Sequence, residues 1–254
     1  MTKRNTQLRR HTIAKIVSEL GEVSVEALSQ KFDTSEVTIR KDLASLETNG
    51  LLLRRYGGAI AIPKEVVNDE NIDKVSDRKI KLAKLAAQLI KDHNRIVIDS
   101  GSTTGALIPE LNYKQGLVVM TNSLHVANAL NALENEPTLL MTGGTWDIRS
   151  ESFQGQVAES VLRSYDFDQL FIGADGVDLL RGTTTFNELI GLSQVMADVS
   201  REVIVMIESE KIGRKIPNLE LAWQSVDVLV TDENLSDQQK LTIESKGVRV
   251  VRAS

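Results

Sequence analysis

Cysteine is absent from this chain of 254 residues, and histidine occurs only three times. The lack of cysteine excludes disulfide bonds and thiolate metal sites, and it fits a reducing compartment. His11, His93 and His125 lie too far apart in the sequence to indicate a metal cluster. The sequence therefore predicts no metal site and no cofactor.

Long apolar runs are absent as well. No segment approaches the ~20 apolar residues that cross a bilayer as a helix, and the amino-terminal stretch MTKRNTQLRRHTIAKIV has no unbroken apolar segment. Hydrophobic residues still make up 41% of the chain and charged residues 26%, a balance typical of a globular protein with a buried core. We therefore expect a soluble, unprocessed, cytoplasmic protein.

The formal net charge of -5 conceals two regions of opposite sign. Residues 1–62 contain ten Lys and Arg against seven Asp and Glu, which gives +3, so residues 63–254 contain 20 against 28, which gives -8. A basic region beside an acidic one indicates that the basic region is the part that meets a polyanion.

Three short helices and a ribbon are predicted in the basic region. Apolar residues share one stripe over residues 6–20, Ser24 can cap a second helix, and Ser35 can cap a third. The buried stripe of the third helix consists of Ile39, Leu43 and Leu46. LLLRRYGGAI then forms two short extended runs around a glycine pair. This order is typical of a winged helix-turn-helix domain.

The outer face of the third helix carries short and basic side chains. With Ile39 buried, Val37 and Lys41 point outward, and Thr38 and Arg40 flank them. Such side chains suit the major groove, where they donate to bases or contact a thymine methyl group. The RRY segment of the ribbon has the charge and reach to grip flanking phosphates or the minor groove. The predicted DNA contacts are Ser35, Val37, Thr38, Arg40, Lys41, Arg54, Arg55 and Tyr56, with further backbone contacts expected from Lys3, Arg4, Arg9 and Arg10.

A small helical interaction module is the alternative, in which the basic residues form only a solvated face. The helix-turn-helix spacing, the outward basic set and the basic ribbon together favour DNA binding. The segment GEVSVEALSQKFDTSEVTIRKDLASLETNGLLLRRYGGAI also resembles the amino-terminal signature of the DeoR family of bacterial transcription regulators. The resemblance implies a domain that reads operator DNA. Lys41 stands where the family usually has a second arginine, and lysine binds phosphate but lacks the bidentate fork that recognises guanine.

The remaining sequence predicts a linker followed by an α/β domain. Residues 63–77 are polar and aperiodic, and beyond them strands alternate with amphipathic helices. Continuous β-branched strands of this kind predict a mostly parallel sheet covered on both faces, which binds ligands at the carboxyl ends of its strands. The predicted strands are residues 95–100, 116–122, 138–144, 169–175, 201–209, 226–232 and 248–253, and the predicted helices are residues 78–91, 102–111, 123–133, 156–163, 188–199 and 235–245.

An anion-binding loop is predicted after the first strand of this domain. VIDSGSTTGALIPEL places Ser100, Gly101, Ser102, Thr103 and Thr104 between a strand and a helix. Backbone N–H groups at the start of a helix, supplemented by hydroxyls, can bind phosphate. The alternative is an ordinary strand-to-helix turn with Ser/Thr capping.

Polar residues of the neighbouring loops can converge on the same crevice. Amides and carboxylates there suit sugar hydroxyls, and a lysine suits a phosphate charge. Each of these residues has an alternative role as a cap, a turn residue or a surface charge. They are Asn122, Ser123, Gly143, Gly144, Asp175, Asn187, Glu188 and Lys211, with Arg149 and Arg214 as secondary candidates.

Residues 78–252 resemble the sensor domain of the DeoR family, which is similar to the ribose-5-phosphate isomerase fold. The resemblance implies a phosphorylated sugar as effector, held at residues 100–104. MTNSLHVANAL, SFQGQVAES and TTTFNE resemble most the repressor of the glucitol (sorbitol) operon, followed by amino-sugar regulators. We therefore expect a repressor that its effector releases from DNA. Residues 1–62 would bind DNA, and residues 78–254 would sense the sugar phosphate and form a homo-oligomer.

An isomerase-like enzyme with an appended helix-turn-helix is the competing function. Sugar-phosphate isomerisation needs a positioned carboxylate and a cation or donor set. In the isomerase family these roles fall on an Asp-Gly-Ala-Asp loop, a lysine and a glutamate; here the lysine's place falls within Thr183–Thr185 and the glutamate's place near Ser193. The sequence also has no nucleophile-elbow, Walker or metal-ligand motif. We therefore predict a binding protein without catalytic residues.

Overall fold

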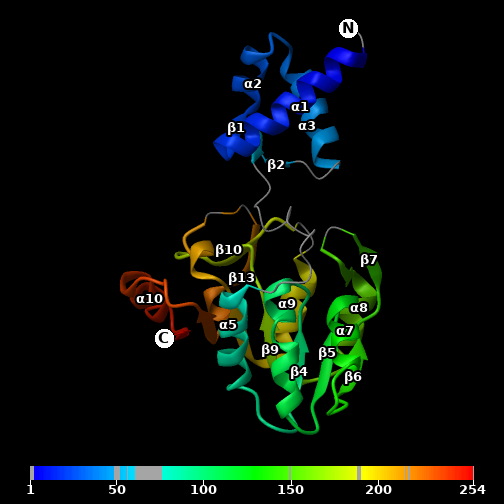
Figure 1. Cartoon of the computed structure of the whole chain (residues 1–254), viewed down its shortest axis with the longest axis vertical. Helices are drawn as coiled ribbons and strands as arrows, with labels where there is room; N and C mark the ends of the chain where they lie inside the picture. Colours follow the sequence, from blue (N-terminus) through cyan, green and yellow to red (C-terminus); the bar gives the residue numbers. More distant parts are fainter. Residues whose placement is uncertain are drawn as a thin grey trace. The chain divides into compact units, whose positions relative to one another are not determined.

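The computed structural model describes residues 3–48, 52–55, 57–60, 76–148, 150–187, 190–214, 216 and 218–253. The chain forms two compact units, Met1–Lys74 and Val75–Ser254 (Figure 1). Among the described residues, no helix is long and apolar enough to cross a membrane.

The first unit is a winged helix-turn-helix. Its elements are α1 (Lys3–Leu20), β1 (Glu22–Ser24), α2 (Val25–Lys31), α3 (Glu36–Thr48), β2 (Leu53–Arg55) and β3 (Gly58–Ile60). The expected stripe of α3, formed by Ile39, Leu43 and Leu46, is buried against Ile13 of α1 and Leu28 of α2. The three helices thus share one small apolar core, and the stripe prediction is confirmed.

Local hydrogen bonds begin α2 and α3 where the sequence predicts. Ser24 Oγ accepts from the backbone N–H of Ala27 at 3.0 Å, and Ser35 Oγ accepts from that of Thr38 at 3.3 Å. Side-chain capping of this kind satisfies backbone donors that have no partner within the helix. These two caps fix the ends of the turn that joins α2 to α3.

The wing contains one strand more than the ribbon predicted from the sequence. β1, β3 and β2 form an antiparallel sheet in that order, with Val23 opposite Ala59. Gly58 permits this pairing because a Cβ atom there would lie 2.5 Å from the carbonyl oxygen of Val23. Because β1 has only three residues, it carries too little alternation to be recognised in the sequence.

The second unit is built on a parallel sheet of seven strands in the order β15-β14-β12-β9-β4-β5-β6. All seven predicted strands are present. Their bounds are β4 (Arg95–Ile98), β5 (Val118–Thr121), β6 (Thr138–Met141), β9 (Phe167–Ile172), β12 (Ser200–Met206), β14 (Val228–Thr231) and β15 (Arg249–Arg252). The inner strands are almost entirely buried, as expected of a parallel sheet with helices on both faces, whereas the edge strands β6 and β15 are partly exposed.

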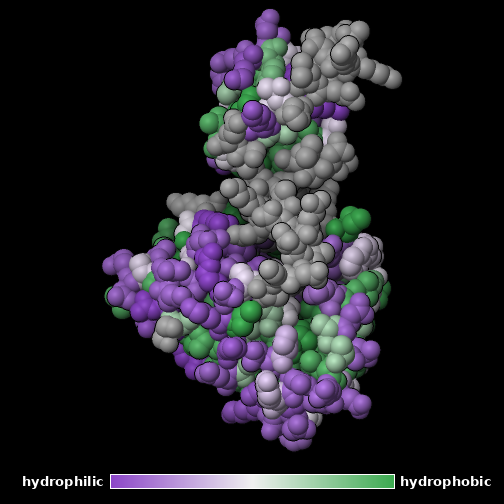
Figure 2. Space-filling view, viewed as in Figure 1, coloured by the Kyte–Doolittle hydropathy of each residue, from purple (hydrophilic) through white to green (hydrophobic). Residues whose placement is uncertain are grey.

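Alternate residues of each strand enter two separate cores. Ile96 and Ile98 of β4 pack with Leu82 and Val126 on one face, whereas Val97 packs on the other. The first face is covered by α5 (Asp77–Ala87), η2 (Ile108–Tyr113) and α7 (Leu124–Asn131), and the second by α8 (Gln156–Leu162), α9 (Gly191–Asp198) and α10 (Asp237–Glu244). The visible outer surface is largely hydrophilic (Figure 2).

In the second unit, the expected elements differ from the observed ones in three places. The helix expected over residues 102–111 is two short pieces, α6 (Ser102–Gly105) and η2, and Pro109 lies in the first turn of η2. Ser76 and Asp77, which we expect in the linker, cap and begin α5. Five short strands were not predicted: β7 (Thr145–Asp147) pairs with β8 (Ser152–Gln154), and β11 (Gly182–Thr185) pairs with β10 (Gly176–Asp178) and β13 (Asn218–Ala222).

Candidate nucleic-acid interface and effector site

The outer face of α3 is exposed, as the helical spacing predicts. Val37 has 59% of its surface exposed, Arg40 and Lys41 are exposed, and Thr38 is half-buried. Asp42, one residue further along the helix, is 1% exposed and points to the interior. This face, with Ser35 at its start and Arg54 and Arg55 of the wing, is called the DNA surface below. Tyr56 lies outside the described residues.

Each arginine of the DNA surface lies against a glutamate. Arg40 Nη2 is 2.6 Å from Glu36 Oε2 one turn earlier, and Arg54 Nε is 2.7 Å from Glu47 Oε2. Arg55 pairs with Glu22 of β1. All three arginines are about half exposed, so each pair is screened by solvent and contributes at most ~1 kcal/mol. A phosphate can therefore replace the glutamate at little cost.

Arg9 and Arg10 of α1 are bound to α3. Arg9 Nε is 2.6 Å and Arg10 Nε is 2.8 Å from the Asp42 carboxylate, and Arg10 also donates to Ser45 Oγ. Arg9 is only 9% exposed, so the expectation that it contacts the DNA backbone is corrected. The Arg9 guanidinium instead holds α1 against α3, because the buried Asp42 carboxylate requires a bonded cation.

The candidate effector site lies at the carboxyl ends of β4, β5 and β9. From β4 the chain adds β5 and β6 on one side of the sheet and β9, β12, β14 and β15 on the other. The strand order therefore reverses between β4 and β9, and parallel α/β sheets bind ligands in the crevice at such a point. Residues 100–104, called the phosphate loop below, follow β4 at this position.

Asn122 holds the phosphate loop from the neighbouring strand. Its Nδ2 donates to Asp99 Oδ1 at 2.8 Å, and its Oδ1 accepts from the backbone N–H of Ser100 at 3.0 Å. Asn122 is fully buried. We expected its amide to meet sugar hydroxyls, but both ends of the amide are bonded to the start of the loop. Asn122 thus sets the loop's conformation.

The phosphate loop presents an exposed part and a buried part. Thr103 and Thr104 are buried, and Thr104 Oγ1 donates to the carbonyl oxygens of Asp99 and Gly101. Gly101 has φ 134°, which side chains rarely adopt. Gly101 and Ser102 are exposed, and among the described residues no acceptor faces their backbone N–H groups. The exposed donors for an anion are therefore these two N–H groups and the Ser102 hydroxyl.

Lys79 of α5 reaches the same loop, a contact that the sequence reasoning missed. Its Nζ donates to Ser102 Oγ at 2.9 Å. The spacing within α5 carried no signal for this contact because the partner lies 23 residues further along the chain. Lys79 brings a cation to a loop whose own sequence has none.

Asp175 lies after β9 and holds the turn beyond β11. Its Oδ2 accepts from Thr185 Oγ1 at 2.8 Å and from the Phe186 backbone N–H at 3.0 Å. Thr185 Oγ1 in turn accepts from the Asn187 N–H, and Asn218 Nδ2 donates to the Asn187 carbonyl. Residues 175 and 187 are thus brought together as predicted. Glu188, the next predicted residue, lies outside the described residues.

A cluster of three acidic side chains, Asp99, Asp175 and Glu220, forms at this edge of the sheet. Burial, together with the nearby carboxylates of Asp99 and Asp175, raises the pKa of Glu220 to about 8, against the hydrogen bond from Ser193. Burial likewise raises the pKa of Asp99, and against the hydrogen bond from Asn122 the result is a pKa of about 6. No ion pair between described residues involves this carboxylate cluster. Glu220 Oε2 also has no hydrogen-bond partner there. Glu220 was not predicted because it lies on a short strand of the small antiparallel sheet.

The remaining predicted residues have mainly structural surroundings. Ser123 caps α7 by accepting from the Val126 N–H at 3.4 Å. Gly144, with φ 112°, would place a Cβ atom 2.6 Å from the Gln154 carbonyl oxygen, whereas Gly143 has no atom within 4 Å of such a Cβ. Lys211 lies half-buried in the turn η3 (Ser209–Lys211) after β12. Of the secondary candidates, Arg214 Nε donates to the Glu210 carbonyl, and Arg149 lies outside the described residues.

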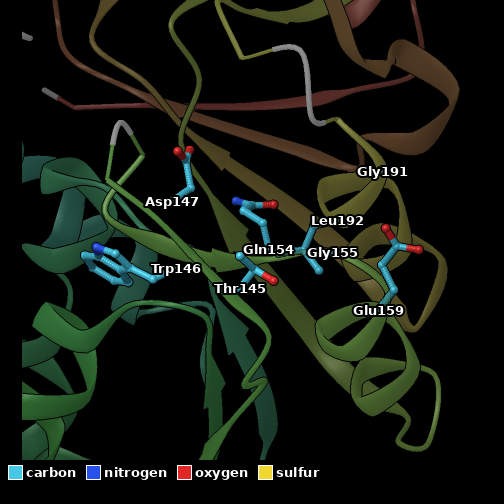
Figure 3. A pocket seen from close by; sticks show the side chains of 8 residues that line it. All are labelled: Thr145, Trp146, Asp147, Gln154, Gly155, Glu159, Gly191 and Leu192. Atoms are coloured by element: carbon cyan, nitrogen blue, oxygen red, sulfur yellow. The ribbon is translucent and has the colours of Figure 1, made fainter.

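A pocket of ~300 Å³ opens between the β7–β8 hairpin and the starts of α8 and α9 (Figure 3). Its lining contains none of the predicted effector residues. The indole ring of Trp146 points away from Glu159, and Glu159 approaches Gly191, where a Cβ atom would lie 3.1 Å from Glu159 Oε1. The lining residues are Thr145, Trp146, Asp147, Gln154, Gly155, Glu159, Gly191 and Leu192. Because the polar groups of the phosphate loop are absent from it, we do not place the effector here.

The positions expected for isomerase chemistry are occupied by structural side chains. Thr183 and Thr185 are buried in β11, and Thr185 donates to Asp175. Ser193 of α9 donates to Glu220 at 2.9 Å. Among the described residues, no group of three or more His, Cys, Asp or Glu side chains is arranged to hold a metal ion.

Two family models match the chain. Residues 9–65 match the DeoR-like helix-turn-helix domain, and residues 74–233 match the DeoR C terminal sensor domain. The two matches correspond to the two compact units.

Proteins of known name are similar along almost the whole length. The putative aga operon transcriptional repressor of Escherichia coli O157:H7 is 36% identical, over 97% of this chain and 93% of that protein. The transcriptional regulator GlpR of Haloferax volcanii is 32% identical, over 96% of each chain. The lactose phosphotransferase system repressor of Lactococcus lactis is 31% identical, over 92% of this chain and 94% of that protein.

Among solved structures, ribose 5-phosphate isomerase A from Methanocaldococcus jannaschii matches 53% of each chain at 22% identity and a TM-score of 0.38. That likeness is too partial to carry an argument about function. The sequence relatives and the two family models do carry one, because they span both units. The chain belongs to the DeoR family of DNA-binding transcriptional regulators, and it is a regulator rather than an enzyme.

Proposed function

We propose that this chain represses a sugar-catabolic operon and that a phosphorylated sugar relieves the repression. The DNA surface of α3 and the wing would bind the operator, and the phosphate loop with its neighbouring loops would bind the effector. Support for a sugar-related operon comes from relatives named as repressors of the aga operon and of a lactose phosphotransferase system. The motif resemblance favours glucitol or an amino sugar.

One observation supports a phosphorylated effector above all. At the point where the strand order reverses, the phosphate loop presents a hydroxyl and backbone N–H groups that bond to no described acceptor, beside carboxylates that suit sugar hydroxyls. Donors of this kind bind phosphate, and acceptors of this kind bind polyols. A sugar phosphate satisfies both halves of the site with one molecule.

On DNA, we propose that Val37, Thr38, Arg40 and Lys41 read the major groove and that Arg54 and Arg55 contact phosphates. A symmetric homo-oligomer would place two such units on operator half-sites. Effector binding must favour an arrangement of the DNA-binding units with weaker operator affinity, because a ligand that binds both arrangements equally shifts nothing.

A gel-shift experiment with the DNA upstream of the chain's own gene tests this function. We expect a shifted band at low salt, a steep loss of affinity as salt rises, and release by at least one member of a panel of sugar phosphates. The panel includes glucitol 6-phosphate and glucosamine 6-phosphate, each beside its unphosphorylated sugar. A band that no sugar phosphate alters would contradict the proposed effector class, and the absence of a band would contradict the assignment of the operator.

A further inference from the structure

A second pocket opens at the amino-terminal edge of the sensor sheet, opposite the edge that carries the phosphate loop. Its volume is ~480 Å³, and its lining includes Gln88 and Leu89 at the end of α5, Gln169 of β9, Glu202 of β12 and Arg249 of β15. The three strand residues lie in the first half of their strands, whereas the phosphate loop follows the end of β4. The pocket is therefore distinct from the candidate effector site.

The strand register places the floor of this pocket on the face of the sheet that α5 covers. Gln169 pairs with Glu202 of β12 and with Ile96 of β4, and Ile96 is buried in the core shared with α5. Neighbours in register project to the same face, so the side chains of Gln169 and Glu202 both lie on the α5 side. A hydrogen bond from Gln169 to the Leu89 carbonyl joins this floor to the end of α5.

Gln169 holds a buried acceptor that lacks a partner. Its Nε2 donates to the Leu89 carbonyl at 2.9 Å and to the Glu202 carboxylate at 2.7 Å. Both of these groups only accept, so the amide orientation is fixed and Oε1 is the free atom. Gln169 is 6% exposed, and among the described residues its Oε1 has no hydrogen-bond partner. Because buried polar atoms are nearly always bonded, this oxygen indicates a missing donor.

The same pocket carries charges of both signs. Asp168 and Glu202 provide two carboxylates, and Lys91 and Arg249 provide two cations. Glu202 Oε1 is 3.6 Å from Arg249 Nη2, so this pair is loose, and the Lys91 ammonium bonds to no described residue. Asn94 Oδ1 accepts from the Lys91 backbone N–H at 2.8 Å, which holds the Asn94 amide in the turn after α5. Acceptors for a ligand thus lie on the sheet, and donors lie in this turn.

This lining selects among small ligands by charge. A phosphate group would lie close to Asp168 and Glu202, and like charges at such distances repel. A simple amine would leave Lys91 without a partner, and a neutral polyol would use none of the four charges. A molecule with one ammonium and one carboxylate satisfies both signs, and charge-assisted hydrogen bonds are the strong ones.

We propose that this pocket binds a free α-amino acid as a second ligand of the sensor. The ammonium group would donate to Gln169 Oε1 and to the Glu202 carboxylate. The carboxylate of the ligand would accept from Lys91 and from the amide of Asn94. The inference is independent of the proposed sugar-phosphate effector, because it uses no residue of that site, and either can fail while the other holds.

The test uses the full chain and four variants. Glu202→Gln removes a charge from the pocket but keeps an acceptor for Gln169, and Lys91→Met removes the exposed ammonium. Glu134→Gln and Lys246→Met are the matched controls, because both side chains are exposed and lie outside the lining. Calorimetry and thermal unfolding measure binding of the standard free L-amino acids. Each amino acid that binds is compared with the acid that lacks its ammonium group and with the amine that lacks its carboxylate.

We expect at least one amino acid to bind with a Kd of about 1 mM or lower and to raise the unfolding temperature of the sensor, because a ligand of the folded chain stabilises it. Glu202→Gln should weaken this binding about 10- to 100-fold, the range for loss of a bond between charged groups. Lys91→Met should weaken it up to about fivefold, because solvent screens an exposed charge. The two control variants should match the unaltered chain, and the acid and the amine should each bind at least about tenfold more weakly than the amino acid.

Three results would overturn the proposal. If no amino acid binds at concentrations up to about 10 mM, the partner of Gln169 Oε1 is a water molecule rather than a ligand. If the acid or the amine binds as tightly as the amino acid, the ligand is not a zwitterion. If Glu202→Gln binds within about twofold of the unaltered chain, the amino acid binds elsewhere.

Lys91→Met decides the question if Glu202→Gln is unfolded at the temperature of the assay. The Lys91 side chain is exposed and bonds to no described residue, so its replacement leaves the fold intact. Amino-acid binding by Lys91→Met as tight as binding by Lys246→Met would then overturn the pocket.

Discussion

The arginines of the DNA surface each lie against a glutamate, whereas the carboxylate cluster of the sensor forms no ion pair between described residues. The arginines of this surface are therefore already paired before they meet DNA. The sensor holds carboxyl groups without an ion pair at the edge where its effector is proposed to bind. The two units should therefore respond differently to their ligands. DNA replaces the weak Arg–Glu pairs that already exist, whereas the proposed effector supplies hydrogen-bond donors to carboxyl groups that form no ion pair between described residues.

The largest expected effect concerns the buried charge cluster that Arg9, Arg10 and Asp42 form in the DNA-binding unit. Asp42→Ala should destabilise this unit by about 3–5 kcal/mol, because it leaves the buried guanidinium of Arg9 without its carboxylate. Such a loss is comparable to the whole stability of a small domain. Calorimetric unfolding should show the loss in the transition of the first unit alone, together with loss of operator binding.

Glu36→Ala is the matched control, because Glu36 is an exposed carboxylate on the same helix. It should leave the unfolding transition within about 0.5 kcal/mol of the unaltered chain. Equal stability of Asp42→Ala and Glu36→Ala would contradict the difference between buried and exposed pairs in this unit.

The next effect concerns operator affinity. Arg40→Ala should weaken operator binding by about 1–3 kcal/mol if Arg40 contacts a base, or lower the salt dependence by about one phosphate contact if it binds the backbone. Anisotropy titrations at several salt concentrations distinguish the two results. Arg163→Ala, an exposed arginine in the sensor, should have no effect. An unchanged affinity and salt slope for Arg40→Ala would remove α3 from the interface.

A third effect concerns the pH dependence of the sensor. The pKa of Glu220 is raised to about 8 in the folded chain, above the value of an exposed glutamate. Its contribution to stability is therefore fully present below the pKa of the unfolded chain and is lost as pH rises toward about 8. Asp99, with a pKa raised to about 6, acts in the same direction. The sensor should become less stable between about pH 4 and 8.

Glu220→Gln should flatten this decline, because glutamine does not ionise. Glu233→Gln is the control with the opposite sign: the hydrogen bond from Lys81 lowers the pKa of Glu233, so its small contribution is lost as pH falls. Calorimetric unfolding of the sensor across this pH range, extended below pH ~4 for Glu233, measures both. If the stability of Glu220→Gln declines with pH as steeply as that of the unaltered chain, Glu220 is not the source of the pH dependence.

The smallest effect concerns the pairs of the DNA surface. Glu36→Gln removes the carboxylate that holds Arg40, and exposed pairs one helical turn apart contribute about 0.3–0.5 kcal/mol. Operator affinity should therefore rise about twofold, with a slightly steeper salt dependence. Weaker binding by Glu36→Gln would mean that Glu36 contacts a base itself, since a carboxylate can accept from cytosine.

Much of the fold follows from local sequence signals. Ser24, Ser35 and the stripe of α3 are local features, and each is confirmed by a cap or by burial. The seven strands of the parallel sheet are continuous apolar runs and were all predicted. The short antiparallel strands were missed because they have three to five residues, and Thr183–Thr185 has no apolar alternation that indicates a strand.

The candidate site was harder to predict because its contacts join distant segments. Gly101 and Ser102 are exposed where the loop pattern places them. Lys79 and Glu220, by contrast, acquire their roles from Ser102 and Ser193, which lie 23 and 27 residues away in the sequence. Asn122 is the opposite case: its residue type led us to expect a contact with the sugar, whereas its amide is bonded to Asp99 and Ser100 at the start of the loop. The periodicity of a single helix or strand carries no information about contacts such as Lys79–Ser102 or Ser193–Glu220, which join different elements.

The most direct test of the account is the affinity of the full chain for its operator with and without a saturating sugar phosphate, measured beside the same sugar unphosphorylated. The account predicts that the phosphorylated sugar lowers operator affinity by about 5- to 150-fold, the usual range of coupling between two sites, and that the unphosphorylated sugar leaves it unchanged. Equal operator affinity in all three conditions, with sugar-phosphate binding confirmed by calorimetry, would contradict it.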